Sequence, residues 1–365
     1  MEELNIGGLK IKIPIIQGGM GVGISLSGLA VAVANQGGVG VISSAGLGLL
    51  YKKSASDFLM ASIEGLKEEI RLAKEKTLGV IGVNIMTAMS NFKDMVITAI
   101  NEKVDIIFAG AGLPLDLPSF LKPGDKTKLV PIVSSARAAK IICSKWKSNY
   151  NYLPDAFVVE GPKAGGHLGF KEQELNKENC SLEVILKDVI DEVKHYEDKV
   201  EIPVIAAGGI YTGSDMYDLM EIGAKGVQLG TRFVTTDECD ASPLFKQEYL
   251  NASEKDIEII DSPVGMIGRA IHNDFLSSVK EGHKIPKKCP FKCIKTCDVE
   301  KSPYCIINAL YNAYKGNFKF GFAFAGSNAY KASKIMSVKE VFTEFLNDFN
   351  KKYLLNKKNI ILYPC

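Results

Sequence analysis

The chain lacks an excess of charge of either sign, and it lacks long apolar runs. Its 44 Lys and Arg residues nearly balance 42 Asp and Glu residues, so the formal net charge is only +2. A charge this small excludes the strongly basic surface on which polyanion binding depends. No apolar stretch approaches the ~20 residues of a membrane-spanning helix. The sequence therefore predicts neither a nucleic acid nor a membrane as a partner.

A signal for export is also missing. The N-terminal stretch MEELNIGGLKIKIP is short, charged and interrupted by glycine, unlike a signal peptide. Without an export signal, the eight cysteines are expected to be mostly reduced thiols or metal ligands rather than disulfides. We therefore expect a cytoplasmic protein, and its 46% hydrophobic content is ordinary for a globular fold.

Eight short apolar runs alternate with helix-like segments along the first two thirds of the chain. Runs that are apolar on both faces are typical of a parallel sheet covered by helices. Eight such units fit a closed (β/α)₈ TIM barrel of the α/β class better than an open sheet. The predicted strands are 11–19, 37–46, 80–86, 104–112, 129–135, 156–161, 203–210 and 224–233.

The alternation breaks after residue 235. We expect the barrel core over 1–235 and an inserted or appended irregular subdomain or lid, containing cysteines, over 236–325. The remaining segment, 326–365, is expected to pack a helix back onto the barrel.

Three helix boundaries are visible in the sequence. Ser337 and Glu340 have the spacing of a capping box, which predicts a helix start. Ser214 is the predicted cap of the helix that follows the seventh strand. A further helix is expected around 305–315, ending at Gly316.

Glycines follow the C-terminal ends of the strands, where the active face of a parallel barrel lies. Gly208 and Gly209 follow the seventh strand, and Gly230 with Thr231 follows the eighth. These two loops form the usual phosphate site of such barrels, because glycine lets backbone N–H groups approach a ligand closely. One glycine pair alone is explained by a tight turn, but the coordinated set favours a ligand.

The polar residues at other strand ends narrow the class of ligand. Asn84, Glu160 and Gln228 offer donors and acceptors to the polar edge of a ring. The glycines of GGMGVG at 18–23 do not have the G-x-G-x-x-G order of a dinucleotide site. A mononucleotide is therefore indicated, and FMN is the simplest candidate.

Seven motifs follow one another along the chain: PIIQGGMGVGIS, LAVAVANQGGVGVISSAG, GVNIM, AGAGLP, VEGPKAGGHLG, PVIAAGGI and GVQLGTRF. In this order they resemble the nitronate monooxygenase (2-nitropropane dioxygenase) family, and they are also similar to the related flavin-containing enoyl-acyl-carrier-protein reductases. The resemblance covers roughly residues 5–235 and, more loosely, AFAGSNAYKASKI at 323–335.

The resemblance implies a role for each matching residue. His167 would face the substrate beside the reactive edge of the flavin. The flavin itself would be held by Gln17, Gly18, Gly19 and Met20 after the first strand, by Asn84 near the ring or ribityl chain, by Glu160 where relatives have Gln or Glu, by Gly165 and Gly166 against its face, and by Gly208, Gly209, Gln228, Gly230 and Thr231 at the phosphate end.

His167 has three interpretations within this resemblance. An imidazole can remove the α-proton of a nitroalkane near neutral pH. In an enzyme that takes only preformed nitronate, it would position the anion, and in an enoyl reductase it would assist the thioester enolate. A lone histidine is more often structural, but its place in AGGH favours substrate contact. His195, His272 and His283 lack such a setting and are expected at the surface.

Three functions follow from these interpretations. The leading one is an FMN-dependent nitronate monooxygenase that converts alkyl nitronates, or also nitroalkanes, with O₂ to a carbonyl compound and nitrite. The alternatives are an FMN-dependent enoyl-acyl-carrier-protein reductase using NAD(P)H, and a non-catalytic flavin-binding or redox-sensing module. The oligomeric state stays open, with a homodimer as one alternative.

Four cysteines form a separate cluster in the sequence. Cys289, Cys293 and Cys297 are spaced by four residues, and Cys305 follows eight residues later. On a helix, residues four apart share one face, so the first three thiols would converge if the segment is helical. Four thiolates suit an iron–sulfur cluster or a structural zinc ion, and a cluster could feed electrons to the flavin. The spacing matches no familiar metal motif, so incidental reduced thiols remain the alternative.

Overall fold

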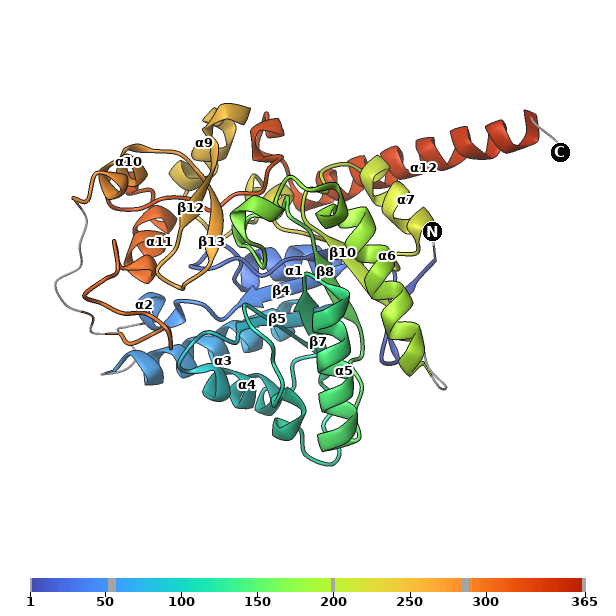
Figure 1. Cartoon of the computed structure of the whole chain (residues 1–365), viewed down its shortest axis with the longest axis horizontal. Helices are drawn as coiled ribbons and strands as arrows, with labels where there is room; N and C mark the ends of the chain where they lie inside the picture. The colour runs from blue at the N-terminus through green and yellow to red at the C-terminus, as the bar shows by residue number, and fades with distance from the viewer. Residues whose placement is uncertain (1, 52–56, 198–200, 284–288, 290, 363–365) are drawn as a thin grey trace.

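The computed structural model of the chain describes residues 2–51, 57–197, 201–283, 289 and 291–362 (Figure 1). Within these ranges, no helix is both long enough and apolar enough to cross a membrane.

All eight predicted strands form, and they close into one parallel barrel. Each barrel strand is paired in parallel with its two neighbours, which confirms the (β/α)₈ TIM-barrel prediction. In chain order the strands are β3 (Ile15–Gln17), β4 (Val39–Ser43), β5 (Val80–Met86), β6 (Ile106–Gly110), β7 (Lys128–Val133), β8 (Phe157–Glu160), β10 (Val204–Ala207) and β11 (Gly226–Leu229).

Helices cover the outside of the barrel between most of its strands (Figure 1). The connection from β6 to β7 differs, because it contains only the 3₁₀ turn η2 (Leu117–Phe120). The covering helices are α1 (Ser27–Asn35), α2 (Leu47–Leu50), α3 (Phe58–Lys76), α4 (Phe92–Asn101), α5 (Ala136–Tyr150), α6 (Leu182–Val193), α7 (Gly213–Ile222) and α8 (Thr231–Val234).

The last helix, α12 (Val338–Leu362), packs against α7 and then extends beyond the barrel (Figure 1). Its contact with α7 is close, since a Cβ added at Gly213 would lie 1.9 Å from the carbonyl oxygen of Phe345. Ser337 and Glu340 form the predicted capping box at its start.

Only part of the first predicted strand, 11–19, enters the barrel, as β3. Its first residue, Ile11, ends β2 (Leu9–Ile11), which pairs antiparallel with β1 (Leu4–Ile6). Leu4, Ile6 and Ile11 are buried in one apolar cluster with inward-facing barrel side chains such as Phe108. The hairpin therefore closes the end of the barrel at which the strands begin.

Two other predicted helix boundaries have different outcomes. The helix expected around 305–315 is present as α11 (Ile306–Tyr314). The cap of α7 is Thr212 and not Ser214, so that prediction was wrong. Thr212 Oγ1 accepts a hydrogen bond from Asp215 N, and the Asp215 carboxylate accepts one from Thr212 N. Ser214 lies inside the first turn, where its hydroxyl is too late in the chain to cap these groups.

A layer from residues 236–325 lies beside the mouth of the barrel. It contains α9 (Pro243–Asn251), α10 (Asp274–Lys280), α11 and the antiparallel strands β12 (Ile257–Asp261) and β13 (Ile267–Ile271). A short strand from the loop after β8, β9 (Gly166–His167), pairs with β13. This pairing attaches the layer directly to the barrel loop that carries the histidine.

Candidate active site

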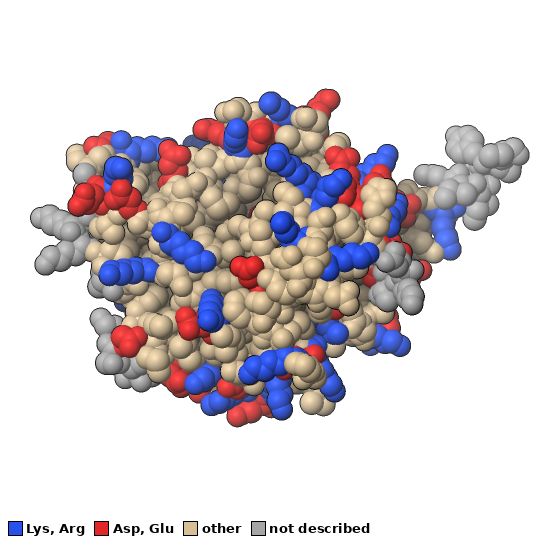
Figure 2. Space-filling model, turned by 60° about the horizontal axis from the view of Figure 1, so that its bottom comes forward, with Lys and Arg blue, Asp and Glu red and all other residues tan. Residues whose placement is uncertain are grey.

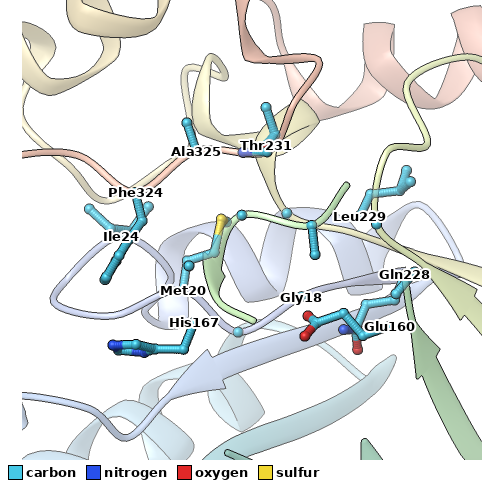
Figure 3. Close-up of a pocket in the computed structure, with 18 of the residues that line it drawn as sticks. Gly18, Met20, Ile24, Glu160, His167, Gln228, Leu229, Thr231, Phe324 and Ala325 are labelled. Atoms are coloured by element: carbon cyan, nitrogen blue, oxygen red, sulfur yellow. The ribbon is translucent and has the colours of Figure 1, made fainter. Parts of the chain in front are cut away.

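A cavity of about 260 Å³ opens where the barrel strands end (Figure 3). Residues from distant parts of the chain meet here, as the sequence predicted. The predicted residues that line it are Gly18, Gly19, Met20, Asn84, Glu160, Gly165, Gly166, His167, Gly208, Gly209, Gln228, Gly230 and Thr231.

Gln17 differs from the rest of the predicted set, because it does not line the cavity. Its side chain is fully buried, its Nε2 donates to the carbonyl oxygen of Gly18, and its Oε1 accepts from Val41 N at 2.9 Å. These bonds tie the turn after β3 to the neighbouring strand. The structure thus places Gln17 behind the cavity wall, where it shapes the Gly18–Gly19 turn.

Glu160 and Gln228 form the polar end of the cavity (Figure 3). Both pair in register with Ala207, so they flank β10 at the same level from β8 and β11. Burial raises the pKa of Glu160 to about 7. Near neutral pH, this carboxyl group can therefore both donate and accept a hydrogen bond, as the amide of Gln228 also can.

The glycines after β10 and β11 form a second polar region with residues from the C-terminal segment. Gly208 and Gly209 have φ angles of +95° and +83°, a conformation that glycine adopts without strain. Gly326 N donates to Thr231 Oγ1 at 2.9 Å, and Asn328 Nδ2 donates to the carbonyl oxygen of Gly209. These contacts join the loop 325–328 to the predicted phosphate loops.

Ser327, in the same loop, carries a buried hydroxyl group with no hydrogen-bond partner among the described residues. Its backbone N–H donates to Lys163 O at 3.1 Å, which fixes it beside the cavity-lining Lys163. A buried donor without a partner costs stability unless a ligand satisfies it. The sequence motif at 323–335 was the only signal for these residues, and it carried no role for any of them.

His167 lies at the other end of the cavity, near Phe324 and Ile24 (Figure 3). Its Nε2 lies 2.8 Å from Ser262 Oγ, and its ring contacts Phe324 edge to face at 4.9 Å between centroids. Burial lowers the pKa of His167 from 6.5 to about 4. The imidazole is therefore neutral at pH 7, with one nitrogen as donor and the other as acceptor.

Arg269 of β13 holds the loop that carries His167. One guanidinium nitrogen, Nη1, donates to the carbonyl oxygens of Pro162 and Ala164, each at 2.6 Å. Burial lowers the pKa of Arg269 from its usual value. Arg269 and Ser262 were not found from the sequence, because they lie about a hundred residues from the loop and in no motif.

Apolar side chains complete the cavity wall around His167. They come from the turn after β3, from α9, from α11 and from the C-terminal segment, namely Met20, Ile24, Phe245, Tyr249, Leu310 and Phe324. The cavity therefore has a polar half at the ends of β8 and β11 and an apolar half around the imidazole. A ligand that fits it combines a polar ring edge with a small reacting group.

The four clustered cysteines lie outside this cavity. Cys289, Cys293, Cys297 and Cys305 line a second cavity of about 220 Å³. The condition for helical convergence is not met, because described residues 291–297 form turns and one isolated bridge between Ile294 and Met89. In the described part of the chain, no three His, Cys, Asp or Glu side chains are placed to hold one metal ion. The zinc or iron–sulfur hypothesis is thus unconfirmed.

The other three histidines and the surface charges agree with the sequence. His195, His272 and His283 are exposed, as expected. On the face shown in Figure 2, Lys and Arg side chains are interspersed with Asp and Glu. This mixture agrees with the small net charge of the sequence.

Comparison with known proteins relates the chain to enzymes. The sequence profile described as nitronate monooxygenase matches residues 2–348. A protein of Staphylococcus saprophyticus named "Probable nitronate monooxygenase" is 27% identical over 296 residues, covering 75% of this chain and 80% of that protein. One of the same name from Staphylococcus aureus is 28% identical over 309 residues, covering 75% and 79%.

Solved structures share the whole fold. FabK from Thermotoga maritima superposes with a TM-score of 0.73 at 27% identity, covering 96% of each chain. Nitroalkane oxidase from Streptomyces ansochromogenes gives a TM-score of 0.73 at 19% identity, covering 94% of this chain and 98% of that one. The second likeness shows the fold alone.

Proposed function

The chain belongs to the nitronate monooxygenase family and is a flavin-dependent oxidoreductase, and from this premise we propose that it uses FMN to oxidise alkyl nitronates with O₂ to carbonyl compounds and nitrite. The observation that carries the substrate class is His167, a neutral buried imidazole in the apolar half of the cavity.

The residues present fit FMN. Glu160 and Gln228 offer donors and acceptors to the polar edge of a flavin ring, and Gly208 and Gly209, which follow Ala207 on β10, leave room for a phosphate. Gly326 and Asn328, which bond to Thr231 and Gly209, line the cavity beside these glycines. A Cβ added at Gly166 would meet no protein atom within 4 Å, so this side of the cavity has room for a ligand. When bound, FMN supplies the electron transfer between substrate and oxygen.

The pKa of His167 favours a nitronate over a neutral nitroalkane. A base with a pKa of about 4 is weak for removing a proton from carbon near neutral pH. A nitronate has already lost that proton, so it needs a hydrogen-bond donor and not a base. The neutral imidazole supplies one N–H group to a nitronate oxygen, while Ser262 Oγ occupies Nε2 at 2.8 Å.

The surroundings support this role. Phe324 packs edge to face against the half-buried imidazole, and Ile24 lines the same cavity. An apolar wall of this kind strengthens a hydrogen bond to an anion. Lys163 lines the same cavity and adds positive charge to it. His167 therefore orients the nitronate carbon, and the apolar wall keeps water away from the reacting atoms.

A second candidate is an FMN-dependent enoyl-acyl-carrier-protein reductase that uses NAD(P)H. The likeness to FabK, at 27% identity over 96% of this chain, favours it. This activity requires a nicotinamide site and a groove for an acyl chain next to His167, which would then assist the enolate. The third alternative, a non-catalytic flavin or redox-sensing module, depends on the cysteine cluster and leaves His167 without a role.

Anaerobic flavin reduction distinguishes these functions. The purified protein is mixed in turn with propionate-3-nitronate, nitroethane at neutral pH, NADH and NADPH, and the flavin absorbance is followed. We expect rapid bleaching by the nitronate and slow bleaching by the other three. Rapid reduction by NADH or NADPH, followed by turnover of a crotonyl thioester, would establish the reductase instead. No reduction by any of the four would favour the module.

Substitution of His167 tests its role directly. We expect His167→Ala to lower the rate of nitronate oxidation by about 10²-fold or more, the range of a lost polar catalytic contact. His195→Ala, at an exposed histidine, is the matched control and should leave the rate unchanged. Full activity of the His167 variant with normal flavin content would contradict the proposal.

A further inference from the structure

The second cavity is a site that the active-site chemistry does not use. Its volume is about 220 Å³, and it lies between the segment 289–305 and the start of α11. The other lining residues are mainly apolar or aromatic: Ile294, Val299, Tyr304 and Ile306, with Lys292 and Ser302. Four thiols on one enclosed, largely apolar wall are an unusual concentration of a single reactive group.

The four thiols lie close enough to influence one another. Cys305, Cys289 and Cys297 each lie near enough to Cys293 to act electrostatically on its thiol. The described cysteines, these four among them, are free rather than paired in disulfides. A bound cation stabilises the thiolate form of a free thiol.

The placement of the four cysteines distinguishes between a single zinc ion and an iron–sulfur cluster. A single zinc ion needs its ligands to meet at one point, at about 2.3 Å from each sulfur. No three potential ligands in the described ranges are placed for that. An iron–sulfur cluster brings its own iron and sulfide atoms, so each cysteine binds a different iron and the four sulfurs surround a cavity. All four cysteines line the second cavity, which is consistent with ligands spread around a cluster.

Backbone N–H groups already point at two of the sulfurs. Lys292 N donates to Cys289 Sγ at 3.4 Å, in a turn where Lys292 has a φ of +45°. The backbone N–H groups of Asn308 and Ile307, in the first turn of α11, face the Cys305 sulfur. Hydrogen bonds of this type to cluster sulfurs tune the reduction potential of iron–sulfur proteins. Lys292 also brings a positive charge to a site that would be anionic.

The segment is anchored on the barrel. Ser90 N donates to the carbonyl oxygen of Cys293 at 3.1 Å, and Lys295 N donates to that of Ala88 at 3.0 Å. These bonds hold Cys293 and Lys295 against the connection after β5. Cys305 is positioned by α11, whose Leu310 lines the active cavity roughly 7–8 Å further along the helix axis.

We propose that Cys289, Cys293, Cys297 and Cys305 bind a cuboidal [4Fe–4S] cluster in the second cavity. On binding, each thiol loses its proton to solvent and its sulfur forms one bond to one iron, with no change in the oxidation state of the sulfur. The cluster is structural or redox-active at a site separate from the active cavity. The proposal does not depend on the substrate of that cavity.

Anaerobic purification of the full-length protein tests the proposal. Iron and acid-labile sulfide are measured after reconstitution with ferrous iron and sulfide, and the dithionite-reduced protein is examined by electron paramagnetic resonance. We expect about four iron and four sulfide atoms per chain, with a cluster signal distinct from that of the flavin. Absence of iron and sulfide, one zinc ion without sulfide, or only disulfide formation would each overturn the proposal.

Matched cysteine variants locate the site. Cys293→Ser should lose the cluster signal and lower the iron content by about tenfold or more, while Cys180→Ser, outside the cavity, should retain both. Cys289→Ser, at a partly exposed position, provides the same test if burial makes the Cys293 variant unstable. Flavin content serves as the measure of folding. Equal iron content in all three variants would contradict the assignment.

Discussion

Burial in the same cavity shifts the pKa values of His167 and Glu160 in opposite directions. Burial disfavours the charged form of each group, so the pKa of the histidine is lowered to about 4 and that of the carboxyl group is raised to about 7. Between pH 4.5 and 6.5, the folded chain therefore keeps both groups neutral. In the unfolded chain both are charged at these pH values.

These shifts predict opposite pH dependences of stability in two variants. For Glu160, the folded state holds a proton that the unfolded state has lost, so its contribution to stability falls as pH rises from about 4.5 to 7. For His167, the unfolded state holds the extra proton, so its contribution rises with pH from about 4 to 6.5. In the natural chain, the pH dependences of these two contributions to the free energy of unfolding nearly cancel.

Urea unfolding of the flavin-free protein across pH 4.5–6.5 checks this prediction. The free energy of unfolding of Glu160→Gln should rise with pH, and that of His167→Asn should fall, each relative to the natural chain and by about 1 kcal/mol per pH unit at most. Slopes of the same sign in both variants would show that burial does not control these groups.

Ser262 is a positioning residue, because its hydroxyl group contacts His167 Nε2 at 2.8 Å and fixes the orientation of the ring. We expect Ser262→Ala to lower the rate of nitronate oxidation by about tenfold, within the range of one lost hydrogen bond, and to shift the pH profile of kcat/KM. Ser262→Thr keeps the hydroxyl group and should restore the profile. An alanine variant with the profile of the natural enzyme would remove Ser262 from this role.

The loop that carries His167 is held in place by a strand that lies about a hundred residues further along the chain. The pairing of β9 with β13 brings Gly166 opposite Arg269 and His167 opposite Gly268. Arg269 then donates two hydrogen bonds to carbonyl oxygens of the loop before His167. The layer of residues 236–325 therefore contributes to the site itself and does not only cover it.

Arg269→Met tests this attachment. The variant leaves the carbonyl oxygens of Pro162 and Ala164 without their donor, which should cost about 2–3 kcal/mol of unfolding free energy and weaken flavin retention. Arg232→Met is the comparison, because that guanidinium is also buried but bonds to Glu344 on α12. Arg232→Met should lower the free energy of unfolding, but its flavin affinity, measured by equilibrium dialysis, should change less than that of Arg269→Met. Equal loss of flavin in both variants would contradict the role given to Arg269.

The two ends of the barrel have different contents. The site occupies the end where the strands finish, and the hairpin β1–β2 fills the other end with Leu4, Ile6 and Ile11. Inward-facing side chains such as Phe108 and Val41 connect the two ends through one apolar cluster. A cavity created at the hairpin should therefore destabilise the entire barrel.

Ile6→Ala tests this coupling. Ile6 is fully buried, so we expect a loss of about 2–5 kcal/mol in unfolding free energy. Leu354→Ala is the control, because Leu354 is 57% exposed on α12 and should change stability by less than about 0.5 kcal/mol. Thermal unfolding followed by circular dichroism measures both. A similar loss in the two variants would show that the hairpin is not part of the barrel core.

Local sequence patterns were enough to predict the barrel and most of the residues that line its cavity. Its eight apolar runs became the barrel strands, since doubly covered strands are apolar throughout. Glycines at strand ends, together with Asn84, Glu160 and Gln228, met at one cavity because the ends of parallel strands share one face. This part of the prediction depended only on periodicity and on the place of each residue within its strand.

The contacts and the burial of those residues depend on long-range packing in the folded chain. The contacts of His167 with Ser262 and of Arg269 with the loop join segments about a hundred residues apart, and no local pattern encodes such pairings. The opposite pKa shifts of His167 and Glu160 likewise depend on burial, which is a property of the folded cavity. The four cysteines line one cavity without the helix on which their spacing would have brought them together. Local periodicity specifies elements, whereas long-range packing specifies the chemistry between them.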